Sequence, residues 1–296
     1  MTSFSRYSRR RFLAASAGLF ALPRAFQPLT VGAVIDRIKT QVGIPWRAQT
    51  VDNLIAGDLR QPVRRIAVTM MATQRLLEQA AARGADLIIT HEPTFFTHQD
   101  RTDTLQDDPV YQYKRDFLAR RGISVFHFHD HWHGRQPDGI ATGMIRALGW
   151  EKNADPTRPR FYRFAPTTLA RLARQMERRL NIRTMRVVGD PNLPVERVMA
   201  SWGNVGLQQG MSYVPQADVV VVGETHEWEL VEYIQDASAA GQPKGLIVLG
   251  HLVSEQEGMR YCAEWLGAFV PEVPVDFLPN DEPFWRPGRP GRSDRR

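Results

Sequence analysis

Hydrophobic residues recur along the first half of the chain with two alternating periods, one typical of buried strands and one typical of amphipathic helices. Residues 63–70 (VRRIAVTM) and 85–91 (ADLIITH) form short apolar runs, and the helical pattern between them ends at Gly84. We expect strands at residues 63–70, 85–91 and 123–133, and helices at residues 73–84, 109–122 and 139–149. This order predicts an α/β architecture with a mostly parallel sheet.

The same alternation begins again after a polar loop, residues 151–159 (EKNADPTRP). An apolar stripe at helical spacing follows over residues 169–180, as in an amphipathic helix. We expect helices at residues 167–180 and 254–269, strands at 185–190, 196–203 and 245–251, and a strand followed by a helix across 217–241. Ser254 and Glu257 have the spacing of a capping box, which predicts that the last helix begins there.

Composition is typical of a globular protein, and the excess positive charge lies at the two ends of the chain. The 296 residues are 43% hydrophobic and carry a formal net charge of +6. Residues 1–24 contain five arginines and no acidic residue, and residues 286–296 contain five arginines and one aspartate, so residues 25–285 carry a net charge of −3. Because this body is slightly acidic, it offers no basic groove for a phosphate backbone, and we expect no nucleic-acid partner.

The N-terminus resembles a twin-arginine export signal. Arg9 and Arg10 are followed by Phe12 and Leu13, and then by an apolar run too short to span a bilayer. We expect residues 1–25 to direct export to the periplasm or another extracytoplasmic space, with no stable membrane insertion after processing. A chance basic start is the alternative, and the cleavage site stays open because no clean small-x-small motif follows.

The C-terminal tail and the single cysteine carry no chemistry that the pattern identifies. Residues 286–296 (RPGRPGRSDRR) lack the apolar residues needed to offset the entropy of ordering, so we expect a disordered basic tail. Cys262 has no second cysteine with which to form an intramolecular disulfide, and its helical surroundings predict a small buried core residue.

Four of the eight histidines, His127, His129, His131 and His133, stand at alternate positions in residues 125–134 (VFHFHDHWHG). If this segment is a strand, all four imidazoles lie on one face and the aromatic residues between them lie on the other. Such a face is either a solvated edge or a metal or acid–base site, because neutral imidazole is a common metal ligand and titrates near neutral pH.

Histidines and carboxylates gather at the predicted carboxyl ends of several strands, where open α/β sheets bind ligands. Three pairs share this arrangement: His91 with Glu92, Glu224 with His226, and His251 with Glu255. Each pair is a weak signal alone, and His226 fits a helix start better than a ligand. The predicted metal ligands are His91, Glu92, His133, His251 and Glu255. They offer the nitrogen and oxygen donors that zinc, manganese or iron take, for one ion or for two ions bridged by a carboxylate.

Five motifs stand at these strand ends and in the loops beside them: VDNLIAGD (residues 51–58), GADLIITHEP (84–93), HDHWH (129–133), ADVVVVGETHE (217–227) and LGHLVSE (249–255). Over most of residues 50–280 they resemble the motifs of the Nif-three-like dinuclear metal-centre family, also described as GTP cyclohydrolase 1 type 2-like proteins. In that family the second motif ends in His-His-Pro, and the third reads His-Thr-Asn-Leu-Asp.

The resemblance implies that the five ligand positions of the family fall on His91, Glu92, His133, His251 and Glu255. Glu92 stands where the family has a second histidine, and His133 stands where it has an aspartate. One imidazole is therefore exchanged for a carboxylate at the first position, and the reverse exchange occurs at the second. The exchange is compatible with a two-metal site, with a single-metal site or with a different metal.

The resemblance also implies an architecture and an assembly. It implies two similar α/β domains, which we place at residues 30–155 plus 242–285 and at residues 156–241. The metal site is expected in the first domain, at the C-terminal ends of its strands. The family assembly is a ring-shaped homo-oligomer, so we expect a hexamer with the metal site facing an internal cavity.

The expected function is a divalent-metal-dependent hydrolase that acts on a small-molecule substrate, with two metal ions per chain. We expect His129 to act as the general acid or base, with Glu224 and His226 lining the pocket. His127 and His131 share the predicted histidine face and would either orient the ligands or be solvated. GTP is a poor candidate substrate for an exported protein, so the substrate stays open. The alternative is a non-catalytic metal-binding or regulatory oligomer.

Overall fold

A computed structural model describes Met1 and residues 28–287 of the chain. The predicted export signal at residues 1–25, apart from Met1, lies outside the described residues, and so does most of the predicted basic tail at residues 286–296. Among the helices of the described residues, none combines the length and the apolar character that a membrane span requires.

The first sheet contains five strands in the order β1-β4-β3-β2-β10. Its members are β1 (Leu54–Ala56), β2 (Ile66–Thr69), β3 (Leu87–Thr90), β4 (Ser124–His127) and β10 (Val275–Phe277). Strands β10, β2, β3 and β4 run parallel, and β1 pairs antiparallel at the edge. Every residue of β2, β3 and β4 is buried, as expected for parallel strands that are covered on both faces.

The second sheet contains five strands in the order β5-β7-β8-β9-β6. Its members are β5 (Phe161–Thr168), β6 (Arg186–Val188), β7 (Pro194–Asn204), β8 (Val219–Glu224) and β9 (Gly245–Val248). Strands β7, β8 and β9 run parallel, and β5 and β6 are antiparallel edges. Two mixed sheets flanked by helices confirm the predicted fold class. The pairing of β9 corrects one detail, because the sequence placed residues 242–285 in the first domain and an apolar run does not reveal which sheet it joins.

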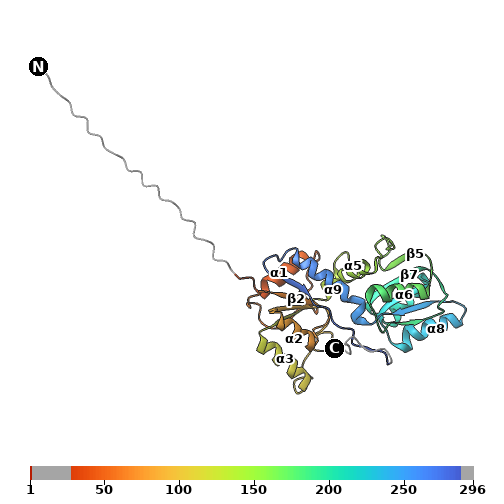
Figure 1. Cartoon of the computed structure of the whole chain (residues 1–296), viewed down its shortest axis with the longest axis horizontal. Coiled ribbons are helices and arrows are strands. Elements are labelled where there is room, and N and C mark those ends of the chain that lie inside the picture. Colours follow the sequence, from red (N-terminus) through yellow and green to blue (C-terminus); the bar gives the residue numbers. More distant parts are fainter. Residues whose placement is uncertain (2–27, 288–296) are drawn as a thin grey trace.

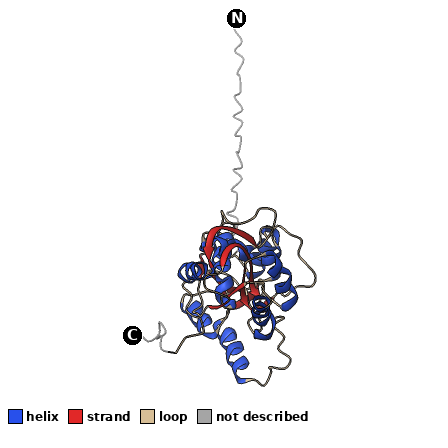
Figure 2. Ribbon diagram, turned by 90° about the vertical axis from the view of Figure 1, so that its right-hand side faces the viewer, coloured by secondary structure: helices blue, strands red, loops and turns tan. Residues whose placement is uncertain are grey.

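Helices cover both sheets, and one long helix lies between them. The α-helices are α1 (Val31–Gln41), α2 (Gln74–Ala82), α3 (Pro109–Arg121), α4 (Asp130–Gly134), α5 (Gly139–Leu148), α6 (Leu169–Leu180), α7 (Leu207–Tyr213), α8 (Glu232–Ala239) and α9 (His251–Gly267), with a 3-10 helix η1 (Val214–Gln216) and a π-helix η2 (Glu227–Val231). We call the part of the chain built around the first sheet the first lobe, and the part built around the second sheet the second lobe. Figure 1 shows α1, α2 and α3 in the first lobe, and α6 and α8 in the second. Helix α9 contacts strands of both sheets. Figure 2 shows the strands inside and the helices outside.

Each lobe has an aspartate–arginine contact near the start of two neighbouring parallel strands, β2 and β3 in the first lobe and β7 and β8 in the second. Asp86, just before β3, accepts hydrogen bonds from the backbone N–H and the guanidinium of Arg64. Asp218, just before β8, accepts the same hydrogen bonds from Arg197. Burial acts to raise the pKa of each carboxyl, but these hydrogen bonds outweigh it and lower both pKa values. The two lobes are therefore built alike at this edge.

The histidine-rich segment departs from the predicted strand. Strand β4 ends at His127, and the short helix α4 follows, so the four imidazoles do not share one face. Asp52 causes the change of direction: its carboxylate accepts hydrogen bonds from the backbone N–H groups of His129 (2.7 Å), Asp130 (2.7 Å) and His131 (2.9 Å). These three bonds stabilise a turn where the period-two pattern predicted extended chain.

Helix α9 begins earlier than predicted. It starts at His251 with Gly250 at its N-cap, and Ser254 lies inside the helix. The Ser254 hydroxyl donates to the carbonyl oxygen of His251 (2.7 Å) and accepts from the N–H of Gly203 (3.0 Å). The predicted capping box is wrong because Gly250, with a φ of 93°, already turns the chain from β9 into the helix. Cys262 is buried in α9, as predicted.

Candidate metal centre

Titratable side chains from several strand ends meet between the two sheets. This histidine–carboxylate cluster consists of His91 and Glu92 after β3, His129 and His133 after β4, Glu224 at the end of β8, and His251 and Glu255 near the start of α9. The segments that carry these side chains follow the carboxyl ends of the parallel strands β3, β4, β8 and β9, where α/β sheets bind ligands. The structure thus brings together all five side chains that the sequence predicted as metal ligands.

Glu255 lies at the centre of the cluster, with its side chain only 2% exposed. One carboxylate oxygen is 3.5 Å from Nε2 of His91 and 3.1 Å from Nε2 of His251. The other oxygen is 3.5 Å from Nε2 of His133. Glu92 completes the group, with an oxygen 3.2 Å from Nε2 of His251. Imidazole nitrogens and carboxylate oxygens that converge in this way supply the donors that a divalent transition metal takes.

The second ring nitrogen of each histidine in the cluster faces an oxygen acceptor. The Nδ1 pairs are His91 with the carbonyl oxygen of Phe128 (3.3 Å), His129 with Asp130 (3.1 Å), His133 with Asp138 (3.1 Å) and His251 with Glu224 (3.0 Å). An acceptor at Nδ1 fixes the orientation of the ring and directs Nε2 into the cluster, as is usual for histidines that bind metal. Nε2 of His91 is buried and has no hydrogen-bond partner among the described residues.

Opposite charges meet in the cluster. Burial lowers the pKa of His91 well below its ordinary value, so this imidazole is neutral. Burial also opposes protonation of His133 and His251, but hydrogen bonds to carboxylates outweigh it and raise the pKa values to about 10 and about 12. The effect of burial on Glu255 is outweighed in the same way, and the pKa of its carboxyl is lowered. Positive charge placed among these carboxylates is therefore strongly stabilised.

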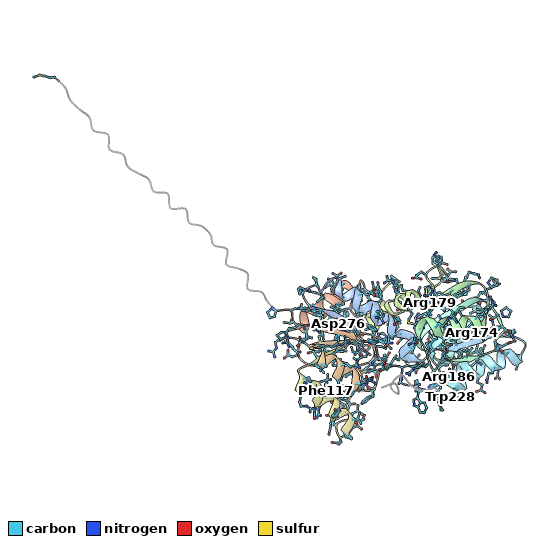
Figure 3. All side chains as sticks on the ribbon, in the orientation of Figure 1. Phe117, Arg174, Arg179, Arg186, Trp228 and Asp276 are labelled. Carbon is cyan, nitrogen blue, oxygen red and sulfur yellow. The ribbon has the colours of Figure 1, made fainter. Side chains whose placement is uncertain are left out.

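His226, a predicted pocket residue, lies outside the cluster. Its ring stacks on Trp228 with 4.4 Å between centroids, and its Nδ1 is 3.3 Å from a carboxylate oxygen of Glu229. Trp228 is 71% exposed and projects at the margin of the second lobe (Figure 3). The structure does not bring His226 to the cluster, because the chain turns into η2 directly after it.

His127 and His131 are both buried, so the solvated alternative is wrong for both. The Nδ1 of His131 donates to Asp52 at 2.7 Å, while its Nε2 accepts a backbone N–H at 2.9 Å. The ring of His131 also stacks on Trp46, with 3.7 Å between centroids. His131 is therefore part of the turn that positions His129, and it does not face the cluster.

Two residues of the site, His98 and Asp138, were not predicted from the sequence. His98 lies in the long loop after β3, with its ring 5.0 Å from that of His129. Asp138 caps α5 by accepting a hydrogen bond from the N–H of Ala141 (3.0 Å), while its other oxygen faces His133. An aspartate before a helix can be recognised as a cap in the sequence. Its contact with His133 depends on the tertiary fold.

Among the described residues, three groups of side chains could each hold one ion, with their donor atoms within 4.8 Å of one another. The groups are His91 with His129 and His133, His91 with Glu92 and Glu255, and His98 with His129 and Asp130. The first two groups share His91 and all of their members belong to the cluster or contact it. These two groups place candidate metal-binding side chains within the cluster.

A cavity of about 930 Å³ opens beside the cluster and is lined by residues of both lobes. The first lobe contributes Phe96 and Lys114, and the second contributes Arg160 and Trp202. Burial lowers the pKa of Lys114 to about 8, although nearby Asp100 acts in the opposite direction. A cavity of this size is typical of small-molecule sites.

The chain is similar to known proteins over most of its length. The Duf34/NIF3 family (NGG1p interacting factor 3) matches residues 29–283. A protein of Clostridium perfringens (strain 13 / Type A), described as a GTP cyclohydrolase 1 type 2 homolog, is 21% identical over 212 residues, which cover 68% of this chain and 77% of that protein. The crystal structure of Staphylococcus aureus protein SA1388 has a TM-score of 0.70 at 18% identity and covers 88% of this chain and 100% of its own. A Bacillus cereus protein related to NIF3 has a TM-score of 0.68 at 15% identity, with 87% and 99% covered. Both structures share the fold of this chain.

Proposed function

The chain belongs to the Duf34/NIF3 family, and on this premise we propose that the histidine–carboxylate cluster binds divalent metal ions and that the protein hydrolyses a small molecule held in the adjoining cavity. The observation that carries the proposal is the convergence of three Nε2 atoms, from His91, His133 and His251, on the buried carboxylate of Glu255. The name of the Clostridium perfringens relative, a GTP cyclohydrolase 1 type 2 homolog, agrees with a hydrolytic reaction.

The proposed ligands are His91, Glu92, His133, His251 and Glu255, holding two ions of zinc, manganese or iron. Three imidazole nitrogens and two carboxylates suit these metals. The buried Nε2 of His91, unpaired among the described residues, is a polar atom that a cation would satisfy. A bound divalent cation would supply Lewis-acid chemistry by polarising a carbonyl or phosphoryl oxygen of the substrate.

His129 is the residue that we assign to proton transfer. Its side chain is 21% exposed and lines the cavity, so it can reach a bound substrate. Asp130 accepts from Nδ1 of His129, and the other oxygen of Asp130 accepts from the hydroxyl of Thr50 (3.0 Å) and from the N–H of Val51 (3.2 Å). Because Asp130 binds Nδ1 of His129, the Nε2 atom of this ring can accept or donate a proton, as general acid–base catalysis requires.

Metal analysis and zinc titration of the purified full chain test the first part of the proposal. We expect Glu255→Gln to lower zinc affinity by at least about tenfold, because it keeps the size of the side chain and removes the central charge. His226→Ala is the matched control, since this histidine lies outside the cluster, and it should bind zinc like the wild type. Equal zinc affinity of Glu255→Gln and the wild type would contradict the proposed site.

Turnover of phosphoesters and cyclic amidines by the metal-loaded chain tests the second part. His129→Gln should lower kcat by about 100-fold or more while the metal content stays at the wild-type level. A chain that binds metal and hydrolyses none of these compounds would contradict the hydrolase proposal. That result would favour the alternative of a non-catalytic metal-binding or regulatory oligomer.

Assembly and export stay predictions. We propose a homo-oligomer, with a hexamer as the expected state, and light scattering of the purified chain measures its mass. For export, replacing Arg9 and Arg10 by lysine should leave the precursor in the cytoplasm, because the twin-arginine machinery reads the arginine pair and not merely positive charge. Normal export of the double-lysine variant would contradict the signal assignment.

A further inference from the structure

The cavity walls outside the cluster carry positive charge and hydrogen-bond donors but no carboxylate. The carboxylates of the lining are Glu92, Glu224 and Glu255, all within the cluster. The two other charged side chains of the lining are Lys114 from the first lobe and Arg160 from the second. Neither forms an ion pair within 4.0 Å with any carboxylate of the described residues. The Lys114 ammonium donates to the carbonyl oxygen of Thr94 at 2.5 Å. The charge of the lining is therefore divided, with both of these cations outside the cluster.

Arg160 is held in place by a polar network from the second lobe. Its Nη1 donates to the hydroxyl oxygen of Tyr213 at 2.9 Å. Gln209 donates to the same oxygen at 2.7 Å and to the hydroxyl of Ser201 at 3.2 Å. Tyr213 and Ser201 are both buried. The network fixes one nitrogen of the guanidinium, and the remaining N–H groups make no side-chain hydrogen bond to any described residue.

The backbone at Arg160 is strained. Its φ of 68° lies in the left-handed region, which is unfavourable for a side chain as long as arginine. The carbonyl oxygen of Arg160 accepts a hydrogen bond from the N–H of Ala200 at 2.9 Å, so the strained residue is attached directly to β7. Strain of this kind persists where the surrounding structure enforces it, and it is concentrated at ligand sites.

Trp202 forms part of the cavity wall, next to Ser201 of this network. The side chain is 7% exposed and lines the cavity, and its Nε1–H is buried with no acceptor among the described residues. An indole N–H can only donate, and a buried unpaired donor is costly. Because this nitrogen has almost no accessible surface, it faces the packed interior and not the open cavity.

We propose that the substrate carries an oxyanion group, a phosphate or a carboxylate, and that Arg160 binds this group on the second lobe while the reacting bond lies at the cluster. The guanidinium suits this role because its planar fork pairs with two oxygens of either anion. Lys114 adds a second positive charge on the first-lobe side. The position of the reacting bond rests on the proposed function, whereas anion binding at Arg160 does not require metal.

Titration calorimetry of the full chain with inorganic phosphate, and separately with acetate, tests this subsite. Each anion is titrated into the zinc-loaded protein and into the same protein treated with a chelator. Arg160→Gln removes the cation. Arg158→Gln is the matched control, because Arg158 lies two residues away, packs over Phe161 at 3.8 Å and is outside the cavity lining. Circular dichroism and zinc content establish that both variants are folded.

We expect at least one of the two anions to bind the chelator-treated wild type with saturation, and the stronger of the two identifies the oxyanion. Arg160→Gln should bind it at least about tenfold more weakly, and Arg158→Gln should match the wild type. The inference is overturned if neither anion binds, if Arg160→Gln matches the wild type, or if Arg158→Gln loses as much affinity. Anion binding only in the presence of zinc would also overturn it and leave the metal proposal standing. If the chain binds the anion but does not bind zinc, this inference stands and the proposed metal site is refuted.

Discussion

Replacing Gly203 by alanine should disrupt the proposed metal centre without removing any donor atom. Gly203 lies in β7 with a φ of 74°. A Cβ at this position would overlap a carboxylate oxygen of Glu255 and lie 3.0 Å from its Cδ. Because the Glu255 side chain is only 2% exposed, it cannot escape into solvent. The added methyl group must therefore push the carboxylate away from the imidazole nitrogens around it.

Gly84 provides a matched control for this substitution. It has the same φ of 74°, and a Cβ there would have no atom within 4 Å. Alanine at either position carries the cost of left-handed backbone, about 1–2 kcal/mol. Only Gly203→Ala adds overlap in a packed interior, which costs about 1–3 kcal/mol. We expect a loss in the free energy of unfolding of about 2–5 kcal/mol for Gly203→Ala and about 1–2 kcal/mol for Gly84→Ala.

The assay combines urea unfolding with a zinc titration against a chromophoric chelator. Displacement of Glu255 should lower the zinc affinity of Gly203→Ala by at least about tenfold, whereas Gly84→Ala should keep the wild-type affinity. Comparing the two variants separates the effect on the metal centre from the effect of backbone strain. If both variants bind zinc as tightly as the wild type, Glu255 is not a ligand and the reasoning is refuted.

Three further outcomes follow from the observed contacts. Glu92→Ala and His133→Ala should each lower the metal content measured by elemental analysis, and an unchanged content in both, against a wild type that binds metal, would exclude the five-ligand site. Asp86→Asn and Asp218→Asn should each lower the free energy of unfolding by about 1 kcal/mol at pH 7. A carboxyl with a lowered pKa stabilises the fold above its ordinary pKa of 3.8 and loses this effect as the pH falls through its folded-state value. Urea unfolding should therefore show the deficit shrink below about pH 4, and a deficit at pH 2 as large as that at pH 7 would contradict the assignment. Cys262→Ser should leave the oligomeric state unchanged, because burial makes this thiol inaccessible and raises its pKa. A covalent dimer of the wild type on a non-reducing gel would contradict this reasoning.

The sequence predicted strands best where they are buried on both faces. Strands β2, β3, β8 and β9 all fall inside predicted apolar runs, because parallel strands in the centre of a sheet read as continuous hydrophobic segments. The three residues of β10 gave no such signal. This strand is defined by its pairing with β2, whose residues lie about 200 positions earlier in the chain, so local periodicity could not reveal it.

The sequence could identify the five candidate ligands of the site but not the orientation of their side chains. The candidate ligands follow strand ends, and the carboxyl ends of parallel strands meet at one edge whatever the details of the loops. The orientation of the histidine segment depended on Asp52, whose carboxylate binds three backbone N–H groups more than 70 positions away. A hydrogen-bond set from a distant residue thus overrode the period-two pattern that predicted one histidine face. His98 reaches the site through an irregular loop, for which periodicity gives no rule.

The carboxylate of Glu92 and the imidazole of His133, the two departures that the sequence resemblance implies, have a physical explanation in the same contacts. Carboxylates and imidazoles alternate along a chain that runs from Glu92 to His251 (3.2 Å), Glu255 (3.1 Å), His133 (3.5 Å) and Asp138 (3.1 Å). An aspartate in place of His133 would stand between two carboxylates, and like charges at these distances repel. A histidine in place of Glu92 would face His251 without a negative partner on that side. The presence of Asp138 beside position 133 therefore favours an imidazole there, and a carboxylate at position 92 restores the negative charge that the exchange removes.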